Sequence, residues 1–467
     1  MEIVLTVMII GVIIFAFRTM PRDWRGTRSL FSATSVILLA ISLYIPFSAI
    51  LALFAGHYTW APGFYEKDLL YQTLGLSLAA TVAFVFGNLL ARKRNTSLRS
   101  NAIRSLGSVP NPILVLLVVV GLTIKLAMIV SVGGMEGAVI RLSSNASSAA
   151  GLAEFESSMI GMRTLSGMAD GAATWGLIQA LKGRKGIVAW SLALTMILAV
   201  SYLTTGKRLL FLIPVICVAI AIHVYVRPLT VRMFPALFGG MLAIGLVTLF
   251  ARIFIPAAAA GISIDLGQVQ YADGSALSFY FYSLEFSTIE MISVAISQAD
   301  NIVAMFGGAI EAFATTNVAP LLYLVPRAIW SEKPELFLDL SYGISAALGS
   351  THIEDPTVGY ASTLVGTSFI LSGPVGTVIV MLLLGIIASR IDGALLDSDW
   401  SIVRVFLYGI LVVACFHFFR QGTLGWTFIV TIVQQLGLIL SVVFLSVLSG
   451  RGSRSASLPD YREVAAK

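Results

Sequence analysis

Long apolar runs separated by short polar stretches follow one another along this 467-residue chain. Each run has about 17–25 residues, the length that an α-helix needs to cross a bilayer. About eleven runs predict membrane spans, approximately at residues 1–17, 29–55, 69–90, 112–132, 165–181, 186–204, 209–226, 233–254, 373–389, 402–419 and 424–448. The pattern predicts an all-α, polytopic helical membrane bundle in which residues 1–467 form a single domain.

Composition agrees with a membrane protein. The chain is 57% hydrophobic and 12% charged, with a mean hydropathy of +0.91, whereas a soluble domain carries about twice as much charge. Cys217 and Cys415 both lie inside apolar runs, so no disulfide framework or metal cluster is expected from them. The net charge of +6 is better explained by basic loops on one side of the membrane than by a nucleic-acid partner.

The basic residues orient the spans. They cluster on alternate loops, around Arg18–Arg28, Arg92–Arg104, Lys182–Lys185, Arg227–Arg232 and Arg390–Arg404, and again in the C-terminal tail. The positive-inside rule places these loops in the cytoplasm, so the N-terminus is expected outside and the C-terminus inside. The first run lacks a preceding basic segment and a following cleavage site, which favours a span over a signal peptide.

Two outer loops are long, at about 133–164 and 255–372. The second, between the eighth and ninth spans, exceeds a hundred residues, far more than a plain connection needs. It contains the stretch FYFYSLEFSTIEMISVAI at 279–296, which predicts an amphipathic or partly buried helix carrying Glu285 and Glu290. Long loops held by a rigid scaffold often carry function, so we expect the chemistry on this side.

Several cations are expected near the outer membrane face, where they are costly unless paired or hydrated. They are Lys207, Arg208, Arg252, Arg327 and Arg420, and Lys333 joins them from the second long outer loop. One guanidinium group can bind two phosphate oxygens at once. The set therefore predicts a site for a lipid-linked phosphate or pyrophosphate. The alternative is that each cation caps a helix end and reaches for lipid headgroups.

Candidate bases lie on the same side. His352, Glu354 and Glu285 could each take a proton from a sugar hydroxyl. A solvated loop histidine and a carboxylate paired with a loop arginine explain the same residues without catalysis. His417 precedes Arg420 by three residues on one helix face, and a packed histidine within the membrane explains it equally well. The few acids do not predict a metal site.

Four short motifs together resemble bacterial oligosaccharide repeat-unit polymerases of the O-antigen polymerase type. They are LVPRAIWSEKPELF at 324–337 in the large outer loop, Gly206-Lys207-Arg208, Arg420 followed by Gly422, and Gly373-Pro374-Val375-Gly376. The eleven-span layout with one dominant outer loop is similar to that family as well. The chain departs from it at 364–369, which reads LVGTSF where members often carry an acid beside an aromatic residue.

The resemblance implies a multi-pass enzyme of the bacterial inner membrane, with a periplasmic N-terminus and a cytoplasmic C-terminus. Such an enzyme transfers a growing glycan from polyprenyl pyrophosphate to an incoming lipid-linked repeat unit. Lys207, Arg208, Arg327 and Arg420 would hold pyrophosphate with support from Arg252 and Lys333, and Trp330 and Tyr360 would stack on sugars. No cofactor or metal is needed if cations stabilise the leaving group. A chain-length regulator and a flippase are the implied partners.

Other functions fit the same pattern. An O-antigen ligase shares the architecture and transfers the finished glycan to lipid A–core. A glycosyltransferase that uses polyprenyl-phosphate sugars would want acids in the first outer loop, where only Glu66-Lys67-Asp68 offers them. A flippase or exporter of the lipid-linked glycan predicts charges inside the membrane and broken helices. Because the spans are mostly uncharged, the pattern favours an outward-facing enzyme.

Overall fold

The computed structural model describes residues 1–20, 23, 27–58, 61–92, 109–131, 160–205, 211–233, 287–325, 339–350, 359–396, 400–433 and 435–455. Within these ranges every regular element is a helix, and the one isolated β-bridge joins Ser29 and Thr230. The all-α prediction is confirmed over this part of the chain.

The N-terminal half supplies long helices and two that change their pitch. They are α1 (Glu2–Thr19), α2 (Ala33–Ser42) continued by the π-helical turn η1 (Leu43–Phe47) and α3 (Ser48–Ala55), η2 (Pro62–Phe64), α4 (Lys67–Arg92), α5 (Asn111–Ser131), α8 (Ile160–Gly183), α9 (Ile187–Thr205), α10 (Leu212–Ala221) continued by η4 (Ile222–Val226), and η5 (Val231–Met233). Pro46 lies inside η1 and has no backbone N–H to donate, which explains the irregular turn there.

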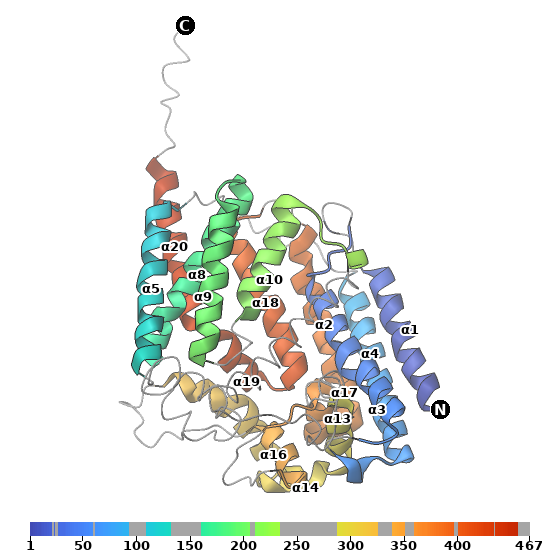
Figure 1. Ribbon diagram of the computed structural model, residues 1–467. Helices are drawn as coiled ribbons and strands as arrows, with labels where there is room; N and C mark the ends of the chain where they lie inside the picture. The colour runs from blue at the N-terminus through green and yellow to red at the C-terminus, as the bar shows by residue number, and fades with distance from the viewer. Residues whose placement is uncertain are drawn as a thin grey trace.

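The C-terminal half mixes short helices with long ones. They are α13 (Thr288–Ser297), α14 (Ala299–Met305), α15 (Ala309–Phe313) with η7 (Ala314–Val318) and η8 (Ala319–Leu324), α16 (Leu340–Ala347), α17 (Thr363–Asp392) with η9 (Gly393–Leu396), α18 (Ile402–Gln421), α19 (Leu424–Phe428) with η10 (Ile429–Val433), and α20 (Leu436–Ser455). The short helices α13, α14 and α16 gather at one end of the bundle, and α20 ends at the opposite one (Figure 1).

Six helices are long and apolar enough to span a membrane, so the multi-pass prediction is confirmed at that level. They match the predicted spans at 1–17, 29–55, 69–90, 112–132, 373–389 and 402–419. A bent pair, Leu424–Val433 with Leu436–Ser449, matches the span at 424–448, and the shorter apolar helices Ile187–Ser201 and Leu212–Val226 match two more. The predicted span 165–181 lies within α8, and the predicted span 233–254 lies outside the described residues after Met233. The number eleven stays a prediction, since six to eight spans are counted in the described chain.

The described residues of the predicted outer loop at 255–372 are mostly helical, apart from turns and the non-helical stretch 359–362. A second bent pair lies there, Ala299–Met305 with Ala309–Leu322, its two halves inclined by 78°. The helix after it begins at Thr363, ten residues before the predicted start of that span, and breaks at Gly373, whose φ is 66° and ψ is −168°. The first ten residues of α17 therefore form a separate short helix. Whether the segment as a whole is a periplasmic loop stays a prediction.

Glycines let α4 and α17 cross at close range. A Cβ atom on Gly87 of α4 would overlap the carbonyl oxygen of Leu382, and one on Gly385 of α17 would overlap that of Phe84. Small residues at such crossings are the usual way for membrane helices to gain van der Waals contact, because lipid offers no hydrophobic drive to associate. The close crossing therefore fixes the position of α17, whose first turn helps to form a polar cavity.

A buried carboxylate ties three helices together at the other end of the bundle. Asp392, at the end of α17, accepts hydrogen bonds from the backbone N–H groups of Ala33 (2.6 Å) and Thr34 (3.1 Å) at the start of α2, and from the hydroxyl of Tyr408 in α18 (3.1 Å). An acid at a helix N-terminus satisfies donors that have no partner within the helix. This contact sets the mutual position of α2, α17 and α18.

Candidate functional site

The end of α18 brings a cation to the side of the bundle where the short helices gather (Figure 1). The helix starts after Ser401, whose hydroxyl accepts the N–H of Arg404 (3.2 Å), and stops at Gly422 in the left-handed conformation, with φ at 78°. Arg420 lies in the last turn of α18. A cation is favoured there because the final carbonyl groups give that helix end a partial negative charge.

Gly422 seats this helix end against the start of α17. Its N–H donates to the carbonyl oxygen of Phe418 (2.9 Å). A Cβ atom on Gly422 would lie 2.8 Å from the Thr363 carbonyl oxygen and would overlap the Thr367 hydroxyl, so glycine is required by contact as well as by conformation. Thr363 itself has a positive φ of 60°. A β-branched residue in that conformation is strained, and such strain concentrates at functional sites.

Besides the end of α18 and the start of α17, α13 lies at this site, and polar contacts fix it against α3 and the connection that follows α3. The Ile289 N–H donates to the Ser48 hydroxyl (3.0 Å), and the Ser293 hydroxyl lies 2.8 Å from that of Tyr58. Glu290, which is buried, accepts the N–H of Ala61 (3.2 Å). Burial raises the pKa of Tyr58 above its ordinary value, so its hydroxyl stays protonated and available for this bond. These contacts hold the other face of α13 toward Arg420.

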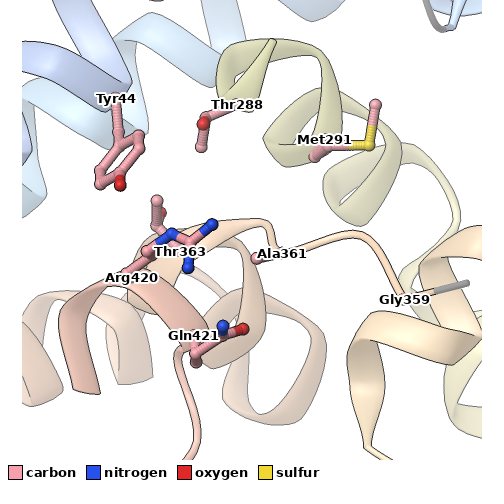
Figure 2. Close-up of a pocket in the computed structure, with 8 residues that line it drawn as sticks. All are labelled: Tyr44, Thr288, Met291, Gly359, Ala361, Thr363, Arg420 and Gln421. Atoms are coloured by element: carbon pink, nitrogen blue, oxygen red, sulfur yellow. The ribbon is translucent and has the colours of Figure 1, made fainter. Parts of the chain in front are cut away.

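A polar cavity of about 120 Å³ lies where these elements meet. Its lining combines one guanidinium, three hydroxyl groups and one carboxamide with apolar and backbone surface, from Tyr44, Thr288, Met291, Gly359, Ala361, Thr363, Arg420 and Gln421. Figure 2 shows the Arg420 side chain reaching from α18 to the space bounded by Tyr44, Thr288 and Thr363. The volume admits several waters or one phosphate-sized group. Because the charge in the lining is positive, an anion suits the cavity best.

Arg420 is the predicted site residue that the structure brings into this cavity. Tyr360, predicted to stack on a sugar, is only 8% exposed, and its N–H donates to the Ser341 carbonyl and the Ser345 hydroxyl (both 3.0 Å). Its neighbours Gly359 and Ala361 line the cavity, and Tyr360 does not. The remaining predicted residues lie outside the described ranges: Lys207, Arg208, Arg252, Arg327, Lys333, Trp330, Glu285, His352 and Glu354.

Sequence reasoning missed most of the lining. Tyr44 and Thr288 are separated by more than 200 residues, and neither stands in a charged or repeated motif. One signal was present for Tyr44, because Pro46 inside an apolar run indicates a break in the helix, and π-helical turns are frequent at functional sites. Gln421 lies between Arg420 and Gly422, so the motif that drew attention to the arginine contained it.

A buried ion pair inside the bundle was missed as well. Lys125 of α5 donates to Asp170 of α8 (2.8 Å) and to the Ser201 hydroxyl of α9 (2.7 Å), and Ser201 donates to the second oxygen of Asp170 (2.9 Å). The side chains of Lys125 and Asp170 are 5% and 14% exposed. The expectation that the spans are mostly uncharged therefore overlooked this pair, which joins three helices.

His417 lies one turn before Arg420 and is fully buried. Neither of its ring nitrogens has a hydrogen-bond partner within the described structure, and its ring meets that of Phe416 edge-on at 5.6 Å. The imidazole ring is therefore packed inside the bundle. Within the same ranges, no three His, Cys, Asp or Glu side chains gather as metal ligands.

Comparison with known proteins yields no relative for this chain: no protein-family model, no curated protein and no solved structure matches it.

Proposed function

We propose that this chain is a membrane glycosyltransferase that polymerises lipid-linked oligosaccharide repeat units, of the O-antigen or exopolysaccharide type. The observation that supports the proposal is the position of Arg420, in a phosphate-sized cavity at the end of a membrane span. The pyrophosphate of a polyprenyl-linked glycan lies at this depth, because its lipid tail is in the bilayer and its sugars are in water.

The cavity offers what a departing pyrophosphate needs. In the reaction, an acceptor hydroxyl of the incoming unit attacks the anomeric carbon of the donor glycan, whose bond to the pyrophosphate oxygen breaks. Negative charge grows on that oxygen, and a fixed guanidinium stabilises it with little reorganisation. The hydroxyl groups of Tyr44, Thr288 and Thr363 surround the same space and can donate to further phosphate oxygens (Figure 2). The acceptor proton would pass to His352, Glu354 or Glu285.

The proposal places the chain in a bacterial inner membrane with this end of the bundle in the periplasm. Alternating basic loops support that orientation. The N-terminal residue of α1 and the short helices α13, α14 and α16 lie toward one end, and α20 ends at the other (Figure 1). A chain whose first and last helices begin and end on opposite sides crosses the membrane an odd number of times. A chain-length regulator and a flippase belong to the proposal as partners.

Replacing Arg420 tests the proposal. We expect R420A to lower chain growth by roughly 10²–10³-fold, the usual loss when one preorganised donor is removed from a developing anion. R420K should recover only part of it, because an ammonium cannot bind two oxygens in a fork. Arg18, exposed at the end of α1, provides the control: R18A removes a cation elsewhere and should leave chain growth unchanged. Glycan length on cells and growth on purified lipid-linked repeats are the measurements.

The outcomes separate the candidate functions. Normal protein levels with single repeat units support polymerisation, and unchanged long chains would remove Arg420 from the reaction. Long polymer retained on the lipid carrier, with none on the cell surface, would indicate the O-antigen ligase instead. Wild-type protein that forms no polymer from purified repeats would contradict the enzyme altogether.

A second candidate function, a flippase or exporter of the lipid-linked glycan, is favoured by a specific observation. The pair Lys125–Asp170 and the bent helix pair at 299–322 are features that transporters use, since charges and broken helices mark their pathways. Purified protein in liposomes distinguishes the two. A flippase would move fluorescent lipid-linked repeats between leaflets without lengthening them, and a polymerase would lengthen them without moving them.

A further inference from the structure

The segment from Ala309 to Leu322 exposes apolar side chains and buries polar ones. Its large apolar side chains are the exposed ones: Ile310 (81%), Phe313 (50%), Val318 (49%), Leu321 (46%) and Leu322 (43%). Its buried side chains include the polar Thr316 and Asn317. A helix beside water places its polar side chains outward, so the surroundings of this one are not those of an aqueous loop.

The polar face of the segment is fixed to α19. The Asn317 side-chain oxygen accepts the N–H of Leu424 at the start of α19 (2.8 Å). A Cβ atom on Gly425 would lie 2.5 Å from both the Thr316 carbonyl oxygen and Pro320, so the two backbones touch. Leu424 is itself 55% exposed and extends the apolar face onto α19. The segment, drawn in sand colour beside the α19 label, runs across the bundle rather than along α8 and α9 (Figure 1).

Charge and backbone conformation agree with this placement. From Ala312 to Pro326 the chain has no Lys, Arg, Asp or Glu. Glu311 is exposed and lies next to the bend, which Gly307 and Gly308 make with φ of 90° and 139°. The bent pair Ala299–Met305 with Ala309–Leu322 is apolar enough to pass as a broken span or a re-entrant segment. The charged residues of this stretch thus lie toward α14 and the bend, and the rest is free of charge.

We propose that residues 309–322 form a lipid-contacting arm that lies in the membrane at its boundary with water. Its apolar face contacts the acyl chains of the bilayer, and its polar face closes against α19. The arm therefore belongs to the membrane part of the protein, although the length of the 255–372 segment suggested an aqueous loop. It packs on the chain just after Arg420, so it would cover one side of the bundle next to the cavity.

Single cysteines can test what covers this face. Cys217 and Cys415 are both buried, so a thiol label should not reach them, and a C217A/C415A background would check that they take up no label. We would place an environment-sensitive fluorophore at I310C, F313C and L321C, with N301C as the exposed control on the α14 side of the bend. The protein is reconstituted in nanodiscs of phosphatidylcholine and phosphatidylglycerol. If the double alanine background elutes as aggregate, the native cysteines can stay because both are buried.

We expect the three arm positions to be quenched by a shallow nitroxide lipid at least threefold more than by aqueous iodide, and N301C to show the opposite ratio. Equal iodide quenching at arm and control positions would overturn the proposal. Labelling in intact cells shows whether another protein or lipid covers this face. Positions shielded in cells but open to iodide in nanodiscs would show that another protein covers the face, which would also overturn it.

Discussion

Lys125 and Asp170 form an ion pair of 2.8 Å between α5 and α8, with the hydroxyl of Ser201 in α9 bonded to both. Charges inside a membrane are stable only when they are paired and hydrogen-bonded, and here each group has two partners. The pair therefore specifies how the three helices dock, whether or not it also serves transport.

Removing one partner of this pair should be more damaging than removing both. We expect K125M to destabilise the protein by about 3–5 kcal/mol, because Asp170 then stays buried without its counter-ion. The double variant K125M/D170N should recover most of that loss. Thermal unfolding in detergent measures the difference, and K185M, at an exposed lysine, is the control. Equal losses in the single and double variants would show that the two charges do not depend on each other.

The crossing of α4 and α17 should tolerate alanine at one glycine of α4 and not at another. A Cβ atom on Gly87 would overlap the Leu382 carbonyl oxygen, and one on Gly75 would meet nothing within 4 Å. We expect G87A to cost about 1–3 kcal/mol of unfolding free energy through overpacking. G75A should be neutral or stabilising by up to about 1 kcal/mol, since alanine favours a helix. Equal unfolding temperatures of the two variants would contradict the close contact between α4 and α17 at Gly87.

Gly422 and Gly56 separate backbone strain from contact. Both end a helix with positive φ, at 78° and 72°, and both donate to the carbonyl four residues earlier at 2.9 Å. Nothing lies within 4 Å of a Cβ on Gly56, whereas one on Gly422 would strike Thr367. G56A should cost about 1–2 kcal/mol from strain alone. G422A should cost more and should also slow chain growth, because Arg420 moves with the helix end.

Asp23 makes the protein sensitive to acid. Burial opposes its ionisation, but hydrogen bonds from His223 (2.9 Å) and Thr27 (2.7 and 2.9 Å) prevail and hold its pKa below the ordinary 3.8. His223 accepts the Leu229 N–H at Nδ1 (3.0 Å), so its proton is on Nε2, which donates to Asp23. The carboxylate therefore contributes stability above pH 3.8, which is lost as pH falls through the lowered pKa. Unfolding free energy measured from pH 3 to 7 should fall with acid less steeply in D23N.

Asp339 should act in the opposite sense on the same measurement. Burial raises its pKa above the ordinary 3.8, although Ser341 donates to it from N–H (2.8 Å) and hydroxyl. The folded state then holds the proton more tightly than the unfolded state. The contribution of Asp339 to stability is full below pH 3.8 and declines as pH rises through the raised pKa. Asn at this position still caps α16, so D339N should remove the decline and leave the helix intact. An unchanged slope in D339N would contradict this.

Hydropathy determined the membrane class and most of the long helices, because a span must satisfy its backbone within one continuous apolar segment. Because hydropathy is a property of each segment, it can be evaluated from the sequence without knowing the fold. The Arg420–Gly422 and Gly373–Pro374 motifs were local too, and the structure places a helix end and a helix break at them.

The cavity could not be predicted from any single segment of the sequence. Tyr44, Thr288, Thr363 and Arg420 come from four separate elements, and only the docking of η1, α13, α17 and α18 brings them together. Asp170 is a similar case, because the position of an acid within one helix does not say which neighbour carries its lysine.

The sequence by itself determined the apolar spans, the basic loops and the candidate cations of the proposed phosphate site. Only the tertiary structure decided which of those residues share a space, and that residues 309–322 turn their apolar side chains outward. The physical reason is that hydropathy reports how much apolar surface a segment has. Whether that surface meets lipid, water or another helix depends on what packs against it.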